Sequence, residues 1–145
     1  MSTGIYAVVR VKGCVKTGPK TESTLLMMGL NRANSCALVP MNPTYEGMLK
    51  RAATHVTWGE VRKDVLEKML DRRGRTAGGR RLEPKAARAC AEKIARAKSL
   101  RGLDIRPVFG LSPPSGGLRS VKLLYPRGDA GPRGDAINEL LLRMI

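Results

Sequence analysis

The chain has 145 residues, a mass of 15.8 kDa and a formal net charge of +15 at pH 7, because 27 lysines and arginines oppose 12 acids. This length suits one compact domain, or a small domain with an extension. The positive excess favours a polyanionic partner, and no apolar run is long enough to span a bilayer. The three cysteines are widely spaced, which argues against a disulfide framework or a zinc site and fits a reducing cytosol.

The first part of the chain predicts two strands joined by a short helix. Residues 5–11 are apolar on both faces of an extended chain, which is typical of a strand in the middle of a sheet. We expect a helix that is capped by Thr21, runs to Met28 and is ended by Gly29. Residues 34–39 read as the second strand, so the three elements suggest a right-handed crossover unit.

The next segment predicts a second helix and a third strand. Asn42 and Pro43 are residues that cap and begin helices. Residues 56–58 read as a short strand with Val56 and Trp58 on one face. Between these signals, apolar residues recur at helical spacing and form one stripe: Tyr45, Met48, Leu49, Ala52, Ala53 and Val56.

Basic residues concentrate in the stretch 62–101, which holds 14 basic and five acidic side chains. Residues 72–81 are rich in arginine and glycine and read as a loop, and a basic, alanine-rich helix is expected over 84–98. An amphipathic helix should precede this loop, with one apolar face: Val61, Val65, Leu66, Met69 and Leu70.

The last third of the chain reads mostly as loops. Residues 111–117 are rich in proline and glycine, and residues 120–125 could form a strand. Asp135 is expected to cap a final helix. The apolar face of that helix would consist of Ile137, Leu140, Leu141 and Met144.

The arginine-rich loop is the strongest candidate for a binding site. Glycine lets the backbone approach a phosphate closely, and arginine makes bidentate contacts with phosphate oxygens. We expect this loop to be mobile alone and to become ordered on RNA. The candidate side chains here and in the following helix are Arg72, Arg73, Arg75, Arg80, Arg81, Lys85 and Arg88.

A second, weaker set of candidates lies in the first 51 residues. Basic and amide side chains on loops can contact RNA backbone or splayed bases. Lys50 and Arg51 lie off the apolar stripe of the second helix and face solvent or a partner. Near the turns that flank the first helix, the candidates are Lys12, Lys16, Lys20, Arg32 and Asn34.

An enzymatic function was weighed against binding. Residues 11–18 partly resemble the phosphate-cradling loop of an acylphosphatase, but no arginine closes the loop and the Walker pattern is missing. His55 is the only histidine, so no Ser-His-Asp triad or metal cluster can be assembled. Cys36 lies in an apolar run and is expected to be buried. The sequence therefore predicts a non-enzyme without cofactor, metal or small-molecule substrate.

Five segments together resemble one protein family. They are YAVVRVKG at 6–13, LNRANSCALVP at 30–40, NPTYEGML at 42–49, VTWGE at 56–60 and RGDAINELL at 133–141. The chain is identified by them as similar to the archaeal or eukaryotic form of large-ribosomal-subunit protein number thirty. The resemblance spans nearly the whole chain and is strongest at 5–60 and 133–145.

The resemblance implies an α+β fold: a ferredoxin-like β-α-β-α-β core at residues 1–60, followed by a helical, loop-rich, basic extension at 61–145. It also implies a structural protein of the cytoplasmic ribosome, with ribosomal RNA and neighbouring large-subunit proteins as partners. The core residues that it assigns to RNA are Lys12, Arg32, Asn34, Tyr45 and Lys50. The composition alone leaves a free RNA- or DNA-binding protein open, such as a chromatin protein or RNA chaperone.

Overall fold

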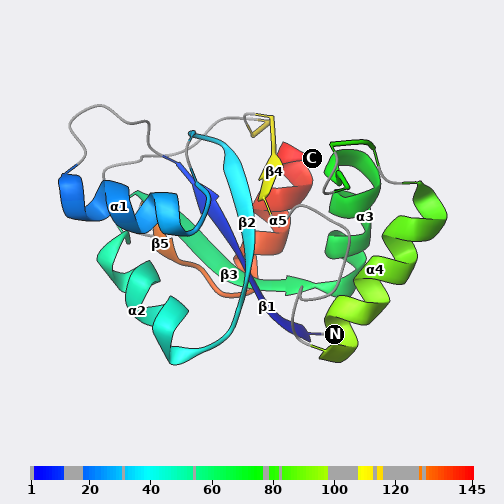
Figure 1. Cartoon of the computed structure of the whole chain (residues 1–145), viewed down its shortest axis with the longest axis horizontal. Helices are drawn as coiled ribbons and strands as arrows, with labels where there is room; N and C mark the ends of the chain where they lie inside the picture. Colours follow the sequence, from blue (N-terminus) through cyan, green and yellow to red (C-terminus); the bar gives the residue numbers. More distant parts are fainter. Residues whose placement is uncertain are drawn as a thin grey trace.

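A computed structural model describes residues 2–11, 18–30, 32–53, 55–76, 79–81, 83–97, 108–112, 114–115, 128 and 130–145. These segments form a five-stranded mixed sheet in the order β4-β2-β1-β3-β5, with helices on both faces (Figure 1). In chain order the elements are β1 (Ser2–Arg10), α1 (Pro19–Met27), β2 (Ser35–Pro40), α2 (Pro43–Arg51), β3 (Val56–Arg62), α3 (Lys63–Arg73), α4 (Pro84–Ala97), β4 (Val108–Gly110), β5 (Gly131–Pro132) and α5 (Ala136–Met144).

The first strand is central, as its apolar sequence predicted. β1 pairs antiparallel with both β2 and β3, so that Val8 lies between Ala37 and Trp58. Side chains alternate across a strand, and Val8 therefore packs into one hydrophobic cluster while Ala7 and Val9 pack into another. Strand β1 supplies the core on both faces of the sheet.

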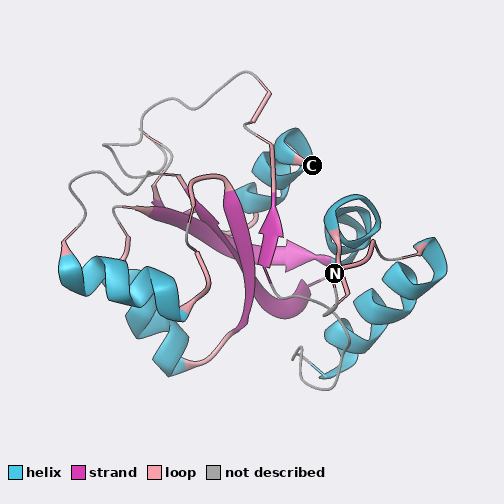
Figure 2. Cartoon of the chain, turned by 45° about the horizontal axis from the view of Figure 1, so that its top comes forward, coloured by secondary structure: helices cyan, strands magenta, loops and turns pink. Residues whose placement is uncertain are grey.

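Helices form a layer on each face of the sheet, as Figure 2 shows. Helices α1 and α2 cover one face, where Leu25 and Leu49 are completely buried. Helices α3, α4 and α5 cover the other face, with Leu70, Ile94 and Leu140 in a second cluster. Residues 61–145 thus share a sheet and a core with residues 1–60, and the division at residue 60 stays a prediction.

The expected crossover unit from β1 through α1 to β2 is wrong, because β1 and β2 are antiparallel neighbours. After α1 the chain reverses at Gly29, whose φ is +81°, and at Asn34, whose φ is +64°. The N–H of Asn34 then donates to the Arg10 carbonyl oxygen at 2.7 Å, so β2 starts where β1 ends. The crossover lies between β2 and β3, which are both antiparallel to β1 and are joined by α2.

Of the three predicted N-terminal caps, only the cap of α2 makes its side-chain hydrogen bond. Asn42 caps α2, and its Oδ1 accepts from the N–H of Tyr45 at 2.9 Å. Helix α1 begins at Pro19, not after Thr21, because proline already has the φ of a first helical residue. Asp135 lies at the start of α5 as expected, but its side chain makes no capping hydrogen bond.

The remaining elements extend or shift the predicted ones. Strand β3 runs on to Arg62, so Val61 lies in a strand and not in the following helix. Helix α4 agrees with the prediction, and residues 120–125 lie outside the described residues. The expected apolar face of α5 is confirmed, because its four members are buried: Ile137, Leu140, Leu141 and Met144.

Candidate nucleic-acid interface

The arginine-rich segment that follows α3 folds back on itself, and we call its described residues, 72–76 and 79–81, the arginine turn. Its first two arginines belong to the last turn of α3, where a loop was expected. Arg75 and Arg81 face each other in an antiparallel bridge. The N–H of Thr76 donates to the Arg80 carbonyl oxygen at 2.8 Å, which closes the turn.

This turn exposes its cationic groups. The side chains of Arg72, Arg75, Arg80 and Arg81 all lie in solvent. Like charges that face each other across paired strands repel, so an anion between Arg75 and Arg81 would stabilise the turn. Arg73 differs from its neighbours, because it is half-buried and its Nη2 donates to Ser112 Oγ.

Helix α4 continues the basic surface. Lys85 and Arg88 are exposed, and residues three apart lie on one side of a helix. They follow Arg81 directly in the chain, at the end of α4 that joins the arginine turn. The turn and the start of α4 therefore present adjacent cations at one end of the molecule (Figure 1).

The second predicted set lies at the other end, around α1 and α2, and the two views agree on this separation (Figures 1 and 2). Lys20, Arg32, Lys50 and Arg51 are exposed there. Lys50 and Arg51 also lie in the last turn of α2, where a positive charge stabilises the helix dipole.

The other four candidates of this set differ from these exposed cations. Asn34 and Tyr45 are half-buried, and the Tyr45 ring packs against the cluster beneath α2. These two residues therefore have structural roles besides any contact with RNA. Lys12 and Lys16 lie outside the described residues, as do all residues of the acylphosphatase-like loop between Val11 and Gly18.

Two arginines are held inside the protein. Arg10 is completely buried, and its guanidinium donates to the Leu30 carbonyl oxygen at 2.6 Å and to Glu22 Oε2 at 3.5 Å. Arg133 is 9% exposed, and its Nε donates to Thr57 Oγ1 at 2.8 Å. These two guanidinium groups hold α1 and β5 to the sheet. Because they are buried, a ligand in solvent cannot reach them.

The described residues offer little for catalysis or metal binding. Among them no three histidines, cysteines or acids gather where they could hold a metal ion. Cys36 is buried as predicted, and this desolvation raises the pKa of its thiol to about 12, although a backbone hydrogen bond from Val8 opposes the shift. Within the described ranges, no helix combines the length and hydrophobicity needed to cross a membrane.

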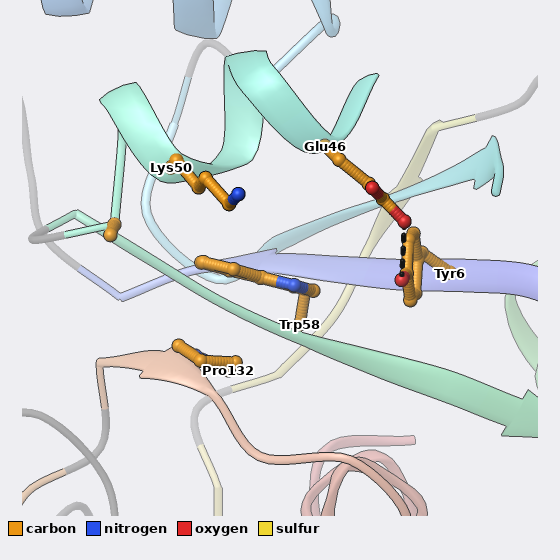
Figure 3. A pocket seen from close by; sticks show the side chains of 6 residues that line it. Tyr6, Glu46, Lys50, Trp58 and Pro132 are labelled. Carbon is orange, nitrogen blue, oxygen red and sulfur yellow. Dashed lines mark hydrogen bonds between the residues drawn. The ribbon is translucent and has the colours of Figure 1, made fainter. Parts of the chain in front are cut away.

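Sequence reasoning missed one pocket of about 320 Å³, which we call the Trp58 pocket. Three neighbouring strands and α2 form its walls, as Figure 3 shows. Its lining residues are Tyr6, Glu46, Lys50, Ala53, Trp58 and Pro132. Strand alternation places Tyr6 on the same face as Val8, but only the pairing of β1, β3 and β5 brings Tyr6, Trp58 and Pro132 to one pocket.

Glu46 and Tyr6 contact each other at the rim of this pocket. The Tyr6 hydroxyl donates to Glu46 Oε1 at 3.3 Å (Figure 3). Partial burial, followed by the negative charge of Glu46, raises the pKa of Tyr6 above its ordinary value. The phenol is therefore neutral at physiological pH and available as a donor.

Comparisons with known proteins agree with the resemblance seen in the sequence. The chain is 40% identical over 159 residues to the large ribosomal subunit protein uL30 of Ignicoccus hospitalis, with both chains fully covered. It is 37% identical over 151 residues to uL30 of Archaeoglobus fulgidus, covering 97% of this chain and 99% of that protein. The family described as ribosomal protein L30p/L7e matches residues 6–56. On this similarity over its full length, the chain belongs to the uL30 family of large-ribosomal-subunit proteins.

Proposed function

We propose that this protein is a structural constituent of the large ribosomal subunit that binds ribosomal RNA and contacts neighbouring ribosomal proteins. Full-length similarity to proteins named as large-subunit constituents supports this assignment. The net charge of +15 supports a nucleic-acid partner, since lysine and arginine displace condensed counterions from phosphates.

The observation that carries the RNA-binding proposal is the arginine turn. Its exposed arginines are mounted on a backbone that is closed by its own hydrogen bonds and pairs Arg75 with Arg81. Such a turn offers several bidentate donors to phosphates at one place. Lys85 and Arg88 extend this surface along α4. The candidates on α1 and α2 form a second contact, so the protein would bridge two segments of RNA.

Replacing Arg75, Arg80 and Arg81 together with glutamine tests the first contact. The logarithm of the affinity for ribosomal RNA falls linearly with the logarithm of the salt concentration. Loss of three phosphate contacts should make this slope shallower by roughly 2 to 3. The affinity at low salt should fall as well. The measurement is filter binding of large-subunit RNA over a series of salt concentrations.

A matched control separates local contacts from total charge. Replacing Lys68, Lys93 and Arg96 with glutamine removes the same charge from exposed positions on α3 and α4 that are not among the proposed contacts. In this variant, the slope of log affinity against log salt concentration should change by less than about 1. Equal losses in both variants would contradict the assignment to the arginine turn.

Sedimentation tests the ribosomal assignment itself. A constituent of the large subunit should travel with that subunit in a sucrose gradient of a cell extract. A free RNA- or DNA-binding protein, the alternative left open by composition, would stay near the top or follow other nucleic acid.

A further inference from the structure

The Trp58 pocket offers ring faces to a ligand. Tyr6 in β1, Trp58 in β3 and Pro132 in β5 lie on three adjacent strands and each contributes a ring. Trp58 is 8% exposed and is one of the residues that line the pocket. Nucleobases stack on such aromatic faces whatever their sequence. The pocket volume, about 320 Å³, is at the small end of the usual range for ligand sites.

Helix α2 adds two polar groups of opposite charge. Glu46 and Lys50 are four residues apart and therefore lie on the same face of the helix. The Lys50 side chain points from α2 toward the Trp58 ring, and Pro132 lies on the far side of that ring (Figure 3). A carboxylate accepts about four hydrogen bonds, so the bond from Tyr6 leaves Glu46 able to accept more.

These groups match the edges of a nucleobase. Guanine, adenine and cytosine each present an amino group that a carboxylate can accept from, whereas uracil presents a single N–H between two carbonyl oxygens. Lys50 supplies a donor for a carbonyl oxygen or a phosphate. Arg51, the next residue along α2, is exposed beside it.

We propose that the Trp58 pocket binds one unstacked base of ribosomal RNA, with its amino edge on Glu46 and its ring against Tyr6, next to Trp58. This inference rests on the proposed function and deepens it. The pocket reads a base, whereas the exposed lysines and arginines contact phosphates. A base held there would fix the register of RNA on the α1–α2 end of the protein.

The charge around the pocket favours RNA over a protein side chain. Lys20, Arg32 and Arg51 are exposed on the same side of the sheet as α2 and would attract the phosphates that flank the base. An apolar protein side chain would make no use of the remaining acceptor sites of Glu46 or of the Lys50 ammonium. Occupation by a neighbouring ribosomal protein is treated as an outcome of the test.

Trp58 is the only tryptophan of the chain, so its fluorescence reports on the pocket alone. The probes are single-stranded hexaribonucleotides that contain uridine except for one central position, which carries guanine, adenine, cytosine, uracil or no base. At low salt, the first three should quench Trp58 fluorescence. The oligomer that lacks the central base should bind roughly 5- to 100-fold more weakly, because stacking and edge contacts are lost.

Variants assign the two polar roles. Glu46→Gln should abolish the discrimination against a central uracil while the oligomers still bind, since the amide offers donors as well as an acceptor. Lys50→Ala should weaken all five oligomers. Glu92→Gln and Lys93→Ala, at exposed positions of α4, are the matched controls and should change neither property.

The outcomes separate this inference from the proposed function. If ribosomal RNA binds on filters but no oligomer changes Trp58 fluorescence, the pocket proposal is wrong and the RNA-binding function stands. Quenching by a purified large-subunit protein, and by no RNA, would overturn it in favour of a protein partner. Failure to retain ribosomal RNA at low salt would instead refute the function on which the inference depends.

Discussion

Gly59 in β3 is a residue on which the C-terminal segment packs without room for a side chain. A Cβ atom built on Gly59 would lie 2.0 Å from the carbonyl oxygen of Gly134 and 2.8 Å from Cγ2 of Ile137. Real Cβ atoms do not approach backbone so closely, so any side chain here would push the segment before α5 away from β3. The absence of a side chain at residue 59 is therefore a condition for the observed packing.

The substitution Gly59→Ala should destabilise the protein by about 1–3 kcal/mol, the usual cost of overpacking. Urea unfolding of the purified protein measures this change. The control is Gly47→Ala in α2, where nothing lies within 4 Å of the added Cβ. Alanine there should stabilise the protein by about 0.5–1 kcal/mol, because it restricts the unfolded chain and favours the helix. An unaffected Gly59→Ala variant would show that the C-terminal segment is not held against β3.

Predictions of burial or exposure for single residues were correct where the polarity of the residue and its neighbours in sequence decides the outcome. Cys36 in its apolar run is buried as expected, and Lys20, Arg32 and Lys50 are exposed. The burial of Arg10 could not be predicted. In sequence, Arg10 looks like a surface arginine, and it differs only in its distant partners, Glu22 and the Leu30 carbonyl.

At the scale of elements, helix starts show how local chemistry decides structure. Asn42 has extended backbone angles and its side chain accepts a hydrogen bond from the first turn of α2. Asp135 has helical backbone angles, and its side chain accepts no such bond. Asn and Asp are equally good capping residues, yet only Asn42 caps its helix. The backbone conformation before each helix is the reason.

The variants Asn42→Ala and Asp135→Ala test this difference. Removal of the Asn42 cap should cost about 1 kcal/mol, since one N–H of the helix loses its acceptor. Loss of Asp135 should cost only a few tenths of a kcal/mol, from its favourable charge near the helix N-terminus. Thermal and urea unfolding of both variants would decide, and equal costs would show that Asp135 caps α5 in solution.

At the scale of the whole molecule, the two hydrophobic clusters are joined through β1. Val8 packs on the α1–α2 side and Val9 on the side of α3, α4 and α5, so neither cluster can lose its order without affecting the other. The C-terminal helix completes the second cluster, where Leu140 is 1% exposed. The chain should therefore unfold as one unit.

Leu140→Ala should lower the free energy of unfolding by about 2–5 kcal/mol, because it leaves a cavity in the core. Trp58 fluorescence, which reports on the opposite face, should still be lost at the same urea concentration as far-UV circular dichroism. Leu142→Ala in the same helix is the control, because Leu142 is 43% exposed, and it should change stability by less than about 0.5 kcal/mol. Separate transitions for the two probes would instead indicate two independently stable parts.

The sequence alone determined the order and type of most elements, the core strand β1, the basic character and the family. These properties depend on periodicity, capping residues, composition and continuous motifs, all of which are local along the chain. The arginine turn was also identified in this way, although its closure through Thr76 and Arg80 was not.

Only the tertiary structure decided how the strands pair. It placed β2 antiparallel to β1, moved the crossover to α2 and brought Tyr6, Trp58 and Pro132 into one pocket. Pairing joins residues far apart in sequence, and its energy comes from packing that no single segment contains. The division of the cations between two ends of the molecule has the same origin, because it follows from which face of the sheet each helix covers.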